Sequence, residues 1–337
     1  MYFIKKLSCL AALFLLLFAM GCQPEKPKSS AEKPAPKKKF FAPEFQRDSA
    51  YSFVNQQVAF GFRLPNTSGH KACKEWLVGK FKSYGLKVME QPFQAKAYTG
   101  KTLNGVNIIA QYNPSASKRI LLAAHWDTRH IADSPLSTER QDEPILGADD
   151  GGSGVGVLLE IARQLQATPT NIGVDFVLFD AEDYGDNASA NPKPESWCLG
   201  SQHWAKNMMP PNYRPKFGIL LDMVGARNAK FPKEGVSLHF APQVVDKVWR
   251  IGQHLGYTRF FDDTKVGTVT DDHLFVNTIA KIPMIDIIGM PRPPDTQNSF
   301  GKHWHTHNDN MDIIDAYTLR AVGQTLLEVI YREAAGE

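Results

Sequence analysis

Short runs of apolar residues alternate along the chain with segments whose apolar positions recur at helical spacing. The apolar runs are continuous and partly β-branched, as expected for strands buried on both faces of a sheet; they cover residues 106–112, 120–124, 174–179, 217–224 and 282–288. Helical spacing is found over residues 68–84, 154–166, 201–208, 244–255 and 316–333. The pattern predicts an α/β fold with a mixed, mainly parallel, twisted central sheet and helices on both faces.

The N-terminus carries the features of an export signal. Two lysines precede an apolar run from Leu10 to Met20, which is shorter than the ~20 residues that a membrane-spanning helix needs. Cys22 follows this run directly after Gly21, where a lipoprotein signal places its acceptor cysteine. We therefore expect a lipoprotein signal peptide over residues 1–22, with Cys22 lipidated. The alternative is an ordinary cleaved signal in which Cys22 is incidental.

Residues 23–45 are rich in Pro and Lys and poor in apolar side chains. Such a segment buries too little surface to offset the entropy lost on ordering, so it predicts a flexible tether. Signal and tether together indicate an exported protein that is lipid-anchored to a bacterial membrane and faces the periplasm. Exposure on the outer cell surface stays open as an alternative.

Residues 46–337 predict a single domain. The first 45 residues hold eight Lys and three Glu of the chain's 38 basic and 35 acidic residues, which leaves 30 basic and 32 acidic residues for the body. A near-neutral body without a basic stripe argues against nucleic acid as a partner. Its two cysteines, Cys73 and Cys198, are too far apart in sequence for a thiolate metal motif; a disulfide and two buried free thiols both stay open.

Acidic residues and histidine follow the predicted strands. In open α/β sheets ligands bind beyond the carboxyl ends of the strands, and these positions hold His125, Asp127, Glu182, Asp183 and Asp222. Any single one of them has an ordinary structural explanation such as helix capping, but capping does not explain acidic residues at several successive strand ends. Oxygen and nitrogen ligands without cysteine suit Zn²⁺, so the pattern predicts a zinc site at this edge.

Four motifs in order resemble the metal-site motifs of zinc-dependent aminopeptidases of the M28 metallopeptidase superfamily and of their relatives, the animal-type glutaminyl cyclases. The motifs are His125-Trp126-Asp127, Gly147 to Gly154, Phe179 to Asp183 and Leu221 to Ala226, and the resemblance covers about residues 50–335. Three further segments resemble the cyclase branch: His125 to Arg129, Thr270 to His273, and Trp304 to Thr306 with Asn308 to Asn310 after it.

The resemblance implies a role for each matching residue. It makes Asp150, Asp183 and His305 the zinc ligands and Glu182 the general acid and base. The family commonly has Glu where this chain has Asp183, so the ligand here is one methylene shorter. Either the backbone lies closer to the metal, or coordination by two oxygens becomes coordination by one.

The same resemblance implies a hydrogen-bonded carboxylate pair, Asp222 with Asp271, beside Glu182. In the aminopeptidase branch His125 would hold a second metal together with Asp150 and Asp222, so His125 and Asp127 are candidates for a second metal site or for support of the first. A proton shared by the carboxylate pair would make a second cation less favourable. We therefore expect one Zn²⁺ per chain, with two as the alternative.

The activity implied is that of a glutaminyl-peptide cyclotransferase, an acyltransferase that converts the N-terminal glutamine of peptides or proteins into pyroglutamate and releases ammonia. Trp304 and Trp197 are candidates for the apolar walls of its substrate pocket. Two alternatives remain from the sequence: a two-zinc M28-type aminopeptidase that uses an activated water, and a metal-dependent peptide-binding lipoprotein without turnover.

Overall fold

The computed structural model describes residues 41–189, 191, 193–291 and 299–337. The expected signal peptide, the lipidation site Cys22 and residues 23–40 of the expected tether lie outside the described residues. Phe45, the last residue of the expected tether, is buried, and its backbone N–H donates to Gln324 Oε1 at 2.8 Å. No helix of the described residues is long and apolar enough to cross a bilayer.

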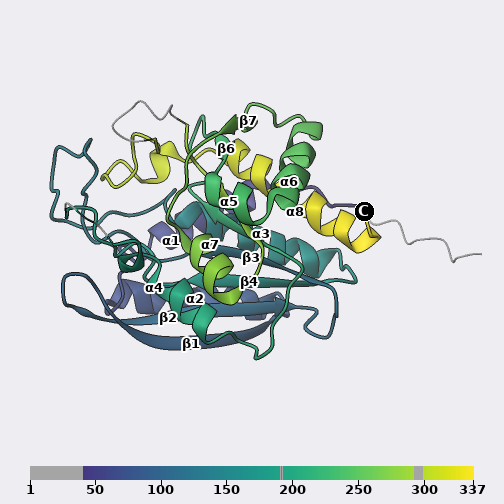
Figure 1. The fold of residues 1–337 in the computed structure, drawn as a ribbon, viewed down its shortest axis with the longest axis horizontal. Helices are drawn as coiled ribbons and strands as arrows, with labels where there is room; N and C mark the ends of the chain where they lie inside the picture. Colours follow the sequence, from purple (N-terminus) through teal and green to yellow (C-terminus); the bar gives the residue numbers. More distant parts are fainter. Residues whose placement is uncertain (1–40, 190, 192, 292–298) are drawn as a thin grey trace, which may run out of the picture. The chain divides into compact units, whose positions relative to one another are not determined.

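Helices and strands are interspersed along the described chain, beginning with two helices and three successive strands (Figure 1). The elements are α1 (Arg47–Val58), α2 (Ser68–Ser83), β1 (Lys87–Lys96), β2 (Thr102–Tyr112), β3 (Arg119–His125), α3 (Gly152–Ala167), β4 (Gly173–Phe179), η1 (Pro194–Ser196), α4 (Leu199–Lys206), β5 (Gly218–Asp222), β6 (Phe231–Lys233), α5 (Gly235–Phe240), α6 (Pro242–His254), β7 (Phe261–Lys265), α7 (Asp272–Phe275), the π-helical turn η2 (Val276–Ala280), β8 (Met284–Ile288), η3 (Met311–Ile313) and α8 (Ala316–Ala335).

Six strands form the central sheet in the order β1-β2-β4-β3-β5-β8. The pairs β4–β3, β3–β5 and β5–β8 are parallel, whereas β1–β2 and β2–β4 are antiparallel. This confirms the predicted mixed, mainly parallel sheet. Strands β3, β4, β5 and β8 are buried along their whole length, which explains why they appear in the sequence as continuous apolar runs.

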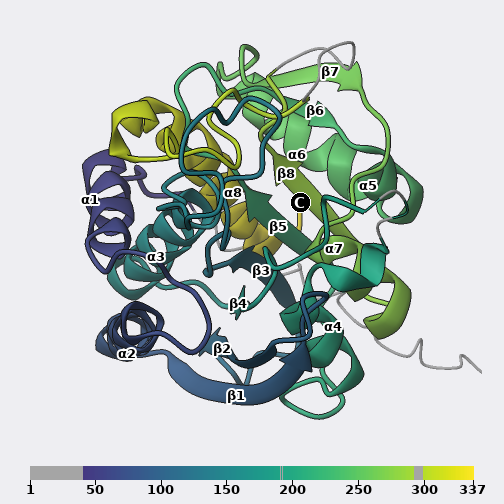
Figure 2. The same cartoon turned by 90° about the vertical axis from the view of Figure 1, so that its left-hand side faces the viewer.

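Helices cover both faces of the sheet, with α1 and α3 on one side and α4 and α7 on the other (Figure 2). Alternate residues of one strand divide between the two cores, as the pleat requires. Ile120 and Leu122 of β3 pack in the larger core with α1, α3 and α8, whereas Leu121 and Ala123 pack in the smaller core with Trp204 of α4. Both predicted helical layers are confirmed.

The parallel strands bring their carboxyl ends to one edge of the sheet. His125 is the last residue of β3, Asp222 is the last residue of β5, and Asp180 follows directly after β4. The chain changes direction after each of these strands, and Asp222 lines one cavity together with Glu182 and Asp183 from the loop after β4. The fold therefore places the predicted site residues together.

Candidate active site

A cavity of about 490 Å³ opens at the carboxyl ends of the parallel strands. Its walls hold every predicted zinc ligand, the predicted acid and base, the carboxylate pair and both predicted tryptophans: Asp150, Glu182, Asp183, Trp197, Asp222, Asp271, Trp304 and His305. The remaining walls include Met223, Ile288 and Met290, which are apolar. A mostly apolar pocket with a few converging charged groups is the usual form of a site for a small polar group.

The predicted ligands Asp150, Asp183 and His305 form one group, with one potential ligand atom from each lying within 4.8 Å of the others. Two ligand atoms at about 2.1 Å from a tetrahedral zinc lie about 3.4 Å apart. His305 Nε2 is 3.1 Å from Asp183 Oδ1 and 3.7 Å from Asp150 Oδ2, which brackets this spacing. All three side chains are buried. The group therefore fits a zinc ion with three protein ligands.

The carboxylate of Asp183 supports this assignment, because neither of its buried oxygens has a hydrogen-bond donor among the described residues. An unsatisfied buried carboxylate is costly unless a cation is bound to it. Burial raises the pKa of Asp183 to about 6, and Asp150 adds to the rise while His305 opposes it. This shorter ligand is in place although the family commonly has Glu at its position.

Asp133 contacts the Nδ1 atom of His305, a contact that the sequence analysis did not predict. Asp133 Oδ1 lies 2.9 Å from His305 Nδ1, and the same carboxylate accepts hydrogen bonds from Arg129 Nε at 3.1 Å and Nη2 at 2.6 Å. A metal-binding histidine typically donates its second N–H to a carboxylate in this way, which leaves the other ring nitrogen free for the metal. Burial works against protonation of His305, but Asp183 and Asp133 outweigh it and raise its pKa to about 9.

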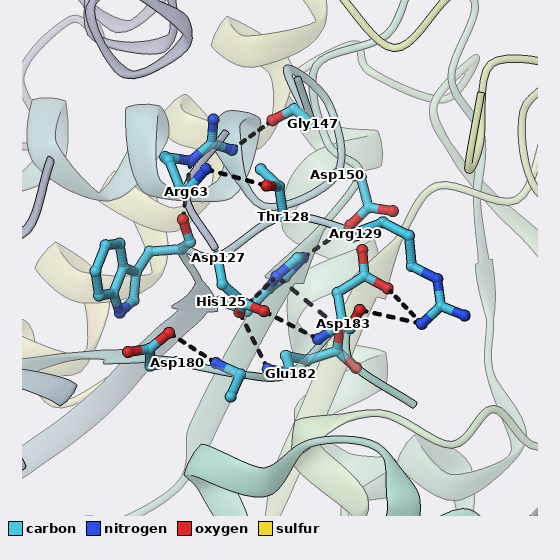
Figure 3. Close-up of polar contacts among 12 residues, drawn as sticks. Arg63, His125, Asp127, Thr128, Arg129, Gly147, Asp150, Asp180, Glu182 and Asp183 are labelled. Atoms are coloured by element: carbon cyan, nitrogen blue, oxygen red, sulfur yellow. Dashed lines mark hydrogen bonds and ion pairs between the residues drawn. The ribbon is translucent and has the colours of Figure 1, made fainter. Parts of the chain in front are cut away.

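Asp127 supports the ligand loop after β4. Its two carboxylate oxygens accept hydrogen bonds from the backbone N–H groups of Glu182 at 3.0 Å and Asp183 at 3.2 Å, as Figure 3 shows. Both oxygens are therefore occupied. Of the two residues predicted as second metal ligands or as support, Asp127 has the supporting geometry.

His125 belongs to a second possible metal group, with Asp150 and Asp222. Its Nε2 atom is 2.9 Å from Asp150 Oδ1 and 3.4 Å from Asp222 Oδ1. However, its Nδ1 atom has no hydrogen-bond partner among the described residues, and Asp127 Oδ1 lies 3.5 Å away. His125 thus lacks the anchoring contact that Asp133 gives to His305.

Glu182 lies beside the first group and lines the cavity. Burial raises its pKa well above the usual range for a glutamic acid; Asp183 and Asp271 add to the rise, and His125 opposes it. A carboxyl group with a raised pKa can both accept and donate a proton near neutral pH. The structure therefore gives Glu182 the environment of a general acid and base.

Asp222 and Asp271 both line the cavity, and one buried oxygen of each has no hydrogen-bond donor among the described residues. Burial raises the pKa of Asp222 well above its usual range, and Asp150 and Asp271 add to this rise. Asp271 also belongs to a buried group with His273 and Asp286. The expected pair is thus part of a larger acidic cluster, and Asp286 is the member that the sequence did not reveal.

Two aromatic rings stack near His305. The ring centroids of Trp304 and His305 lie 3.7 Å apart at an interplanar angle of 16°. The ring centroids of Trp197 and His305 lie 6.2 Å apart at an interplanar angle of 19°. The guanidinium of Arg129 lies 4.6 Å from the centroid of Trp197. Gly185 makes this position of Trp197 possible, because a Cβ atom at Gly185 would be 1.9 Å from the indole ring.

Asp309 holds the turn that presents Asp150. Its two carboxylate oxygens accept from the backbone N–H groups of Asp149 at 2.7 Å and Asp150 at 3.1 Å. The Asp149 carboxylate in turn accepts from the N–H groups of Gly225 and Ala226, after β5. These contacts connect three loops that are distant in sequence, and each loop carries one of the motifs found in the sequence.

Four residues around the cavity have left-handed backbones although they are not glycine. Their φ angles are 53° for Ala181, 56° for Cys198, 50° for Met223 and 53° for His305. A side chain in this region costs roughly 1 kcal/mol per residue. Tertiary contacts must hold these turns, which aim the neighbouring side chains into the cavity.

Cys73 and Cys198 are both buried and both free, so the structure supports two separate thiols and no disulfide between them. Cys73 lies on α2. Cys198 precedes α4 and lies next to Glu182, where its Sγ atom is 3.1 Å from Glu182 Oε1.

Comparison with known proteins agrees with this geometry. The family model for peptidase family M28 matches residues 107–330, which is more than half of the chain and includes both metal groups. The chain belongs to peptidase family M28.

Among solved structures, a glutaminyl cyclase from Bacteroides thetaiotaomicron bound to N-acetylhistamine is 49% identical, with a TM-score of 0.83 over 86% of this chain and 99% of that chain. A Zn-dependent exopeptidase from Parabacteroides distasonis has the same identity, coverage and TM-score. A glutaminyl-peptide cyclotransferase from Gloydius blomhoffii is 24% identical over 298 residues, which is 78% of this chain and 75% of that protein.

Proposed function

We propose that this M28 protein is a glutaminyl-peptide cyclotransferase that converts N-terminal glutamine of peptides or proteins into pyroglutamate with release of ammonia. The observation that carries the proposal is the joint position of Asp150, Asp183, His305 and Glu182 on one small cavity. Its support is the 49% identity to the B. thetaiotaomicron glutaminyl cyclase over 86% of the chain.

The reaction is an intramolecular acyl transfer. The substrate's α-amine attacks the γ-amide carbon, and the γ-nitrogen leaves as ammonia. Asp150, Asp183 and His305 would hold a zinc ion, which would provide a Lewis acid for the γ-carbonyl oxygen. Glu182 accepts a proton from the attacking amine and returns it to the leaving nitrogen, for which its raised pKa is suited.

The cavity walls hold the glutamine so that amine and carbonyl stay in contact. Positioning of this kind lowers barriers by about 7–11 kcal/mol in favourable intramolecular reactions. Trp304 and Trp197 give the pocket two flat apolar walls that exclude water. Exclusion of water also disfavours hydrolysis of the γ-amide, so the cyclic product is favoured.

We propose one zinc per chain, at Asp150, Asp183 and His305. The supporting observation is the anchoring of His305 by Asp133 together with the lack of an equivalent hydrogen bond at His125 Nδ1. The alternative is a second zinc ion at His125, Asp150 and Asp222, a group that shares Asp150 with the first. Elemental analysis of purified protein tests the count, and two zinc ions per chain would overturn this proposal.

The decisive test of the reaction follows two products in parallel. A glutaminyl peptide should release ammonia, and a leucyl anilide should release no aniline above background. Glu182→Gln should lower the ammonia rate by about 10²–10⁴-fold at unchanged zinc content, whereas the exposed control Glu139→Gln should have wild-type activity. Aniline release without ammonia would establish the two-zinc aminopeptidase instead.

A peptide-binding protein without turnover is the other alternative. It would bind glutaminyl peptides with the same affinity in the wild type and in Glu182→Gln, and neither protein would release ammonia. Calorimetric titration of both proteins with one glutaminyl peptide separates binding from catalysis.

We also propose that the chain is exported and lipid-anchored through Cys22, with the catalytic domain facing the periplasm. The support is the order of lysines, apolar run, Gly21 and Cys22 at the N-terminus. In a bacterial host, Cys22→Ser should move the protein from the membrane fraction to the soluble fraction. Retention of the variant in the membrane fraction would exclude lipidation at Cys22 as the anchor.

A further inference from the structure

Cys198 is joined to Glu182 by two hydrogen bonds. Its backbone N–H donates to Glu182 O at 2.9 Å, and its thiol donates to Glu182 Oε1 at 3.1 Å. The next residue, Leu199, donates its N–H to Ala181 O at 3.0 Å. These backbone hydrogen bonds fix the start of α4 to the loop that carries Glu182 and bring the Cys198 thiol into contact with the Glu182 carboxylate.

The geometry gives the two oxygens of Glu182 different surroundings. Oε1 accepts from the Cys198 thiol, whereas Oε2 lies 3.9 Å from His125 Nδ1 and has no hydrogen bond among the described residues. Because Cys198 is fully buried, the pKa of its thiol is raised well above the usual value, and the neighbouring carboxylates raise it further. The sulfur therefore keeps its proton and acts as a donor.

We infer that Cys198 is a positioning residue for the cyclisation: its thiol holds Glu182 Oε1, so that Oε2 is the oxygen that exchanges protons with the substrate. This inference rests on the proposed function, because it assigns a role beside the general acid and base of that reaction. A carboxylate with a free torsion would spend part of its time with neither oxygen directed at the amine, which lowers kcat without altering substrate binding.

The competing explanation is that Cys198 only fills space between α4 and the loop after β4. A small buried thiol is a common core side chain, so loss of packing and loss of the donor must be separated. Cys198→Ala removes both, whereas Cys198→Ser keeps a donor of similar size. Cys73→Ala is the matched control, since it removes the body's other buried free thiol, on α2, without touching Glu182.

The test measures kcat and KM for ammonia release from a glutaminyl peptide, with zinc content and Tm as readouts of folding. Cys198→Ala should lower kcat about five- to tenfold, the usual effect of losing one hydrogen bond, with KM within twofold of wild type. Cys198→Ser should keep kcat within threefold, and Cys73→Ala should keep it at the wild-type value. An unchanged kcat in Cys198→Ala, or an equal loss in Cys198→Ser, overturns the inference.

A spectroscopic measurement covers the case in which Cys198→Ala does not fold. The infrared difference spectrum of wild type minus Cys198→Ser isolates the S–H stretch of Cys198. This band should lie at lower frequency than that of Cys73 and should shift in Glu182→Gln; a band insensitive to Glu182→Gln refutes the contact. If the wild type releases no ammonia but cleaves a leucyl anilide, the proposed function fails, and the same kcat comparison on the anilide decides the role of Cys198.

Discussion

Replacing Asp133 by Asn tests how strongly the support of His305 controls zinc binding. The wild-type carboxylate faces His305 Nδ1 at 2.9 Å and accepts two hydrogen bonds from Arg129 at 3.1 and 2.6 Å. The amide of Asn keeps one oxygen acceptor but loses the charge, so charge-assisted contacts become neutral ones. Such a change costs about 1–1.5 kcal/mol, and we expect zinc affinity to fall roughly tenfold, the low end of the effect of losing a supporting carboxylate.

The assay is competition for zinc against a chromophoric chelator at fixed pH. Asp133→Ala should lower the zinc affinity about a hundredfold, the upper end of the effect of losing a supporting carboxylate. Asp183→Asn, which alters a ligand itself, should bind zinc more weakly still. Asp142→Asn, on the same loop but exposed, is the control and should bind zinc as the wild type does. If Asp133→Asn and Asp133→Ala both bind zinc within twofold of wild type, His305 is not the ligand or Asp133 does not support it.

Three further predictions concern stability and the pocket. Burial opposes ionisation of Glu234, but His273 and two backbone amides lower its pKa to about 2. The ionised carboxylate therefore adds ~3 kcal/mol to the free energy of unfolding above pH ~4.5, and this contribution is lost as the pH falls toward 2. Denaturant titrations should show that Glu234→Gln is less stable than wild type at pH 7 and that the difference shrinks at low pH. Gly185→Ala should displace Trp197 and raise KM several-fold, whereas Gly79→Ala, whose Cβ meets no atom within 4 Å, should not. Removal of zinc by a chelator should lower Tm by about 5–10 °C, which calorimetry can measure, if zinc is present at about 100 times its Kd.

The parallel core of the fold was predictable because its strands are buried on both faces. Every residue of β3 and β4 is buried, and both strands are largely apolar, with Asp175 as the one charged residue inside β4. Strand β1 escaped prediction because it is the edge strand, with only Gln91 and Phe93 buried and polar and apolar side chains mixed at the other positions. Helix α1 was missed for a related reason, since its sequence is largely polar and only a narrow face packs against α3 and α8.

The candidate site was predictable where side chains follow a strand or sit in an ordered motif. Asp133 has neither signal: it lies in the irregular segment between β3 and α3, and only the folded chain brings it to His305, 172 residues later. From the sequence, Cys198 could be either a free thiol or half of a disulfide. Its contact with Glu182 could not be predicted because it depends on the turn before α4. Contacts that support a ligand or a base depend on tertiary geometry, which short-range pattern does not contain.

The left-handed turns at Ala181, Met223 and His305 bear on how this enzyme can be engineered. Glycine at Ala181 would relax the backbone but would also loosen the aim of the side chains next to it, and glycine at Met223 would in addition remove a buried side chain from the cavity wall. Efforts to make a hardier catalyst should therefore alter the outer helices and the edge strand, and leave these three turns as they are.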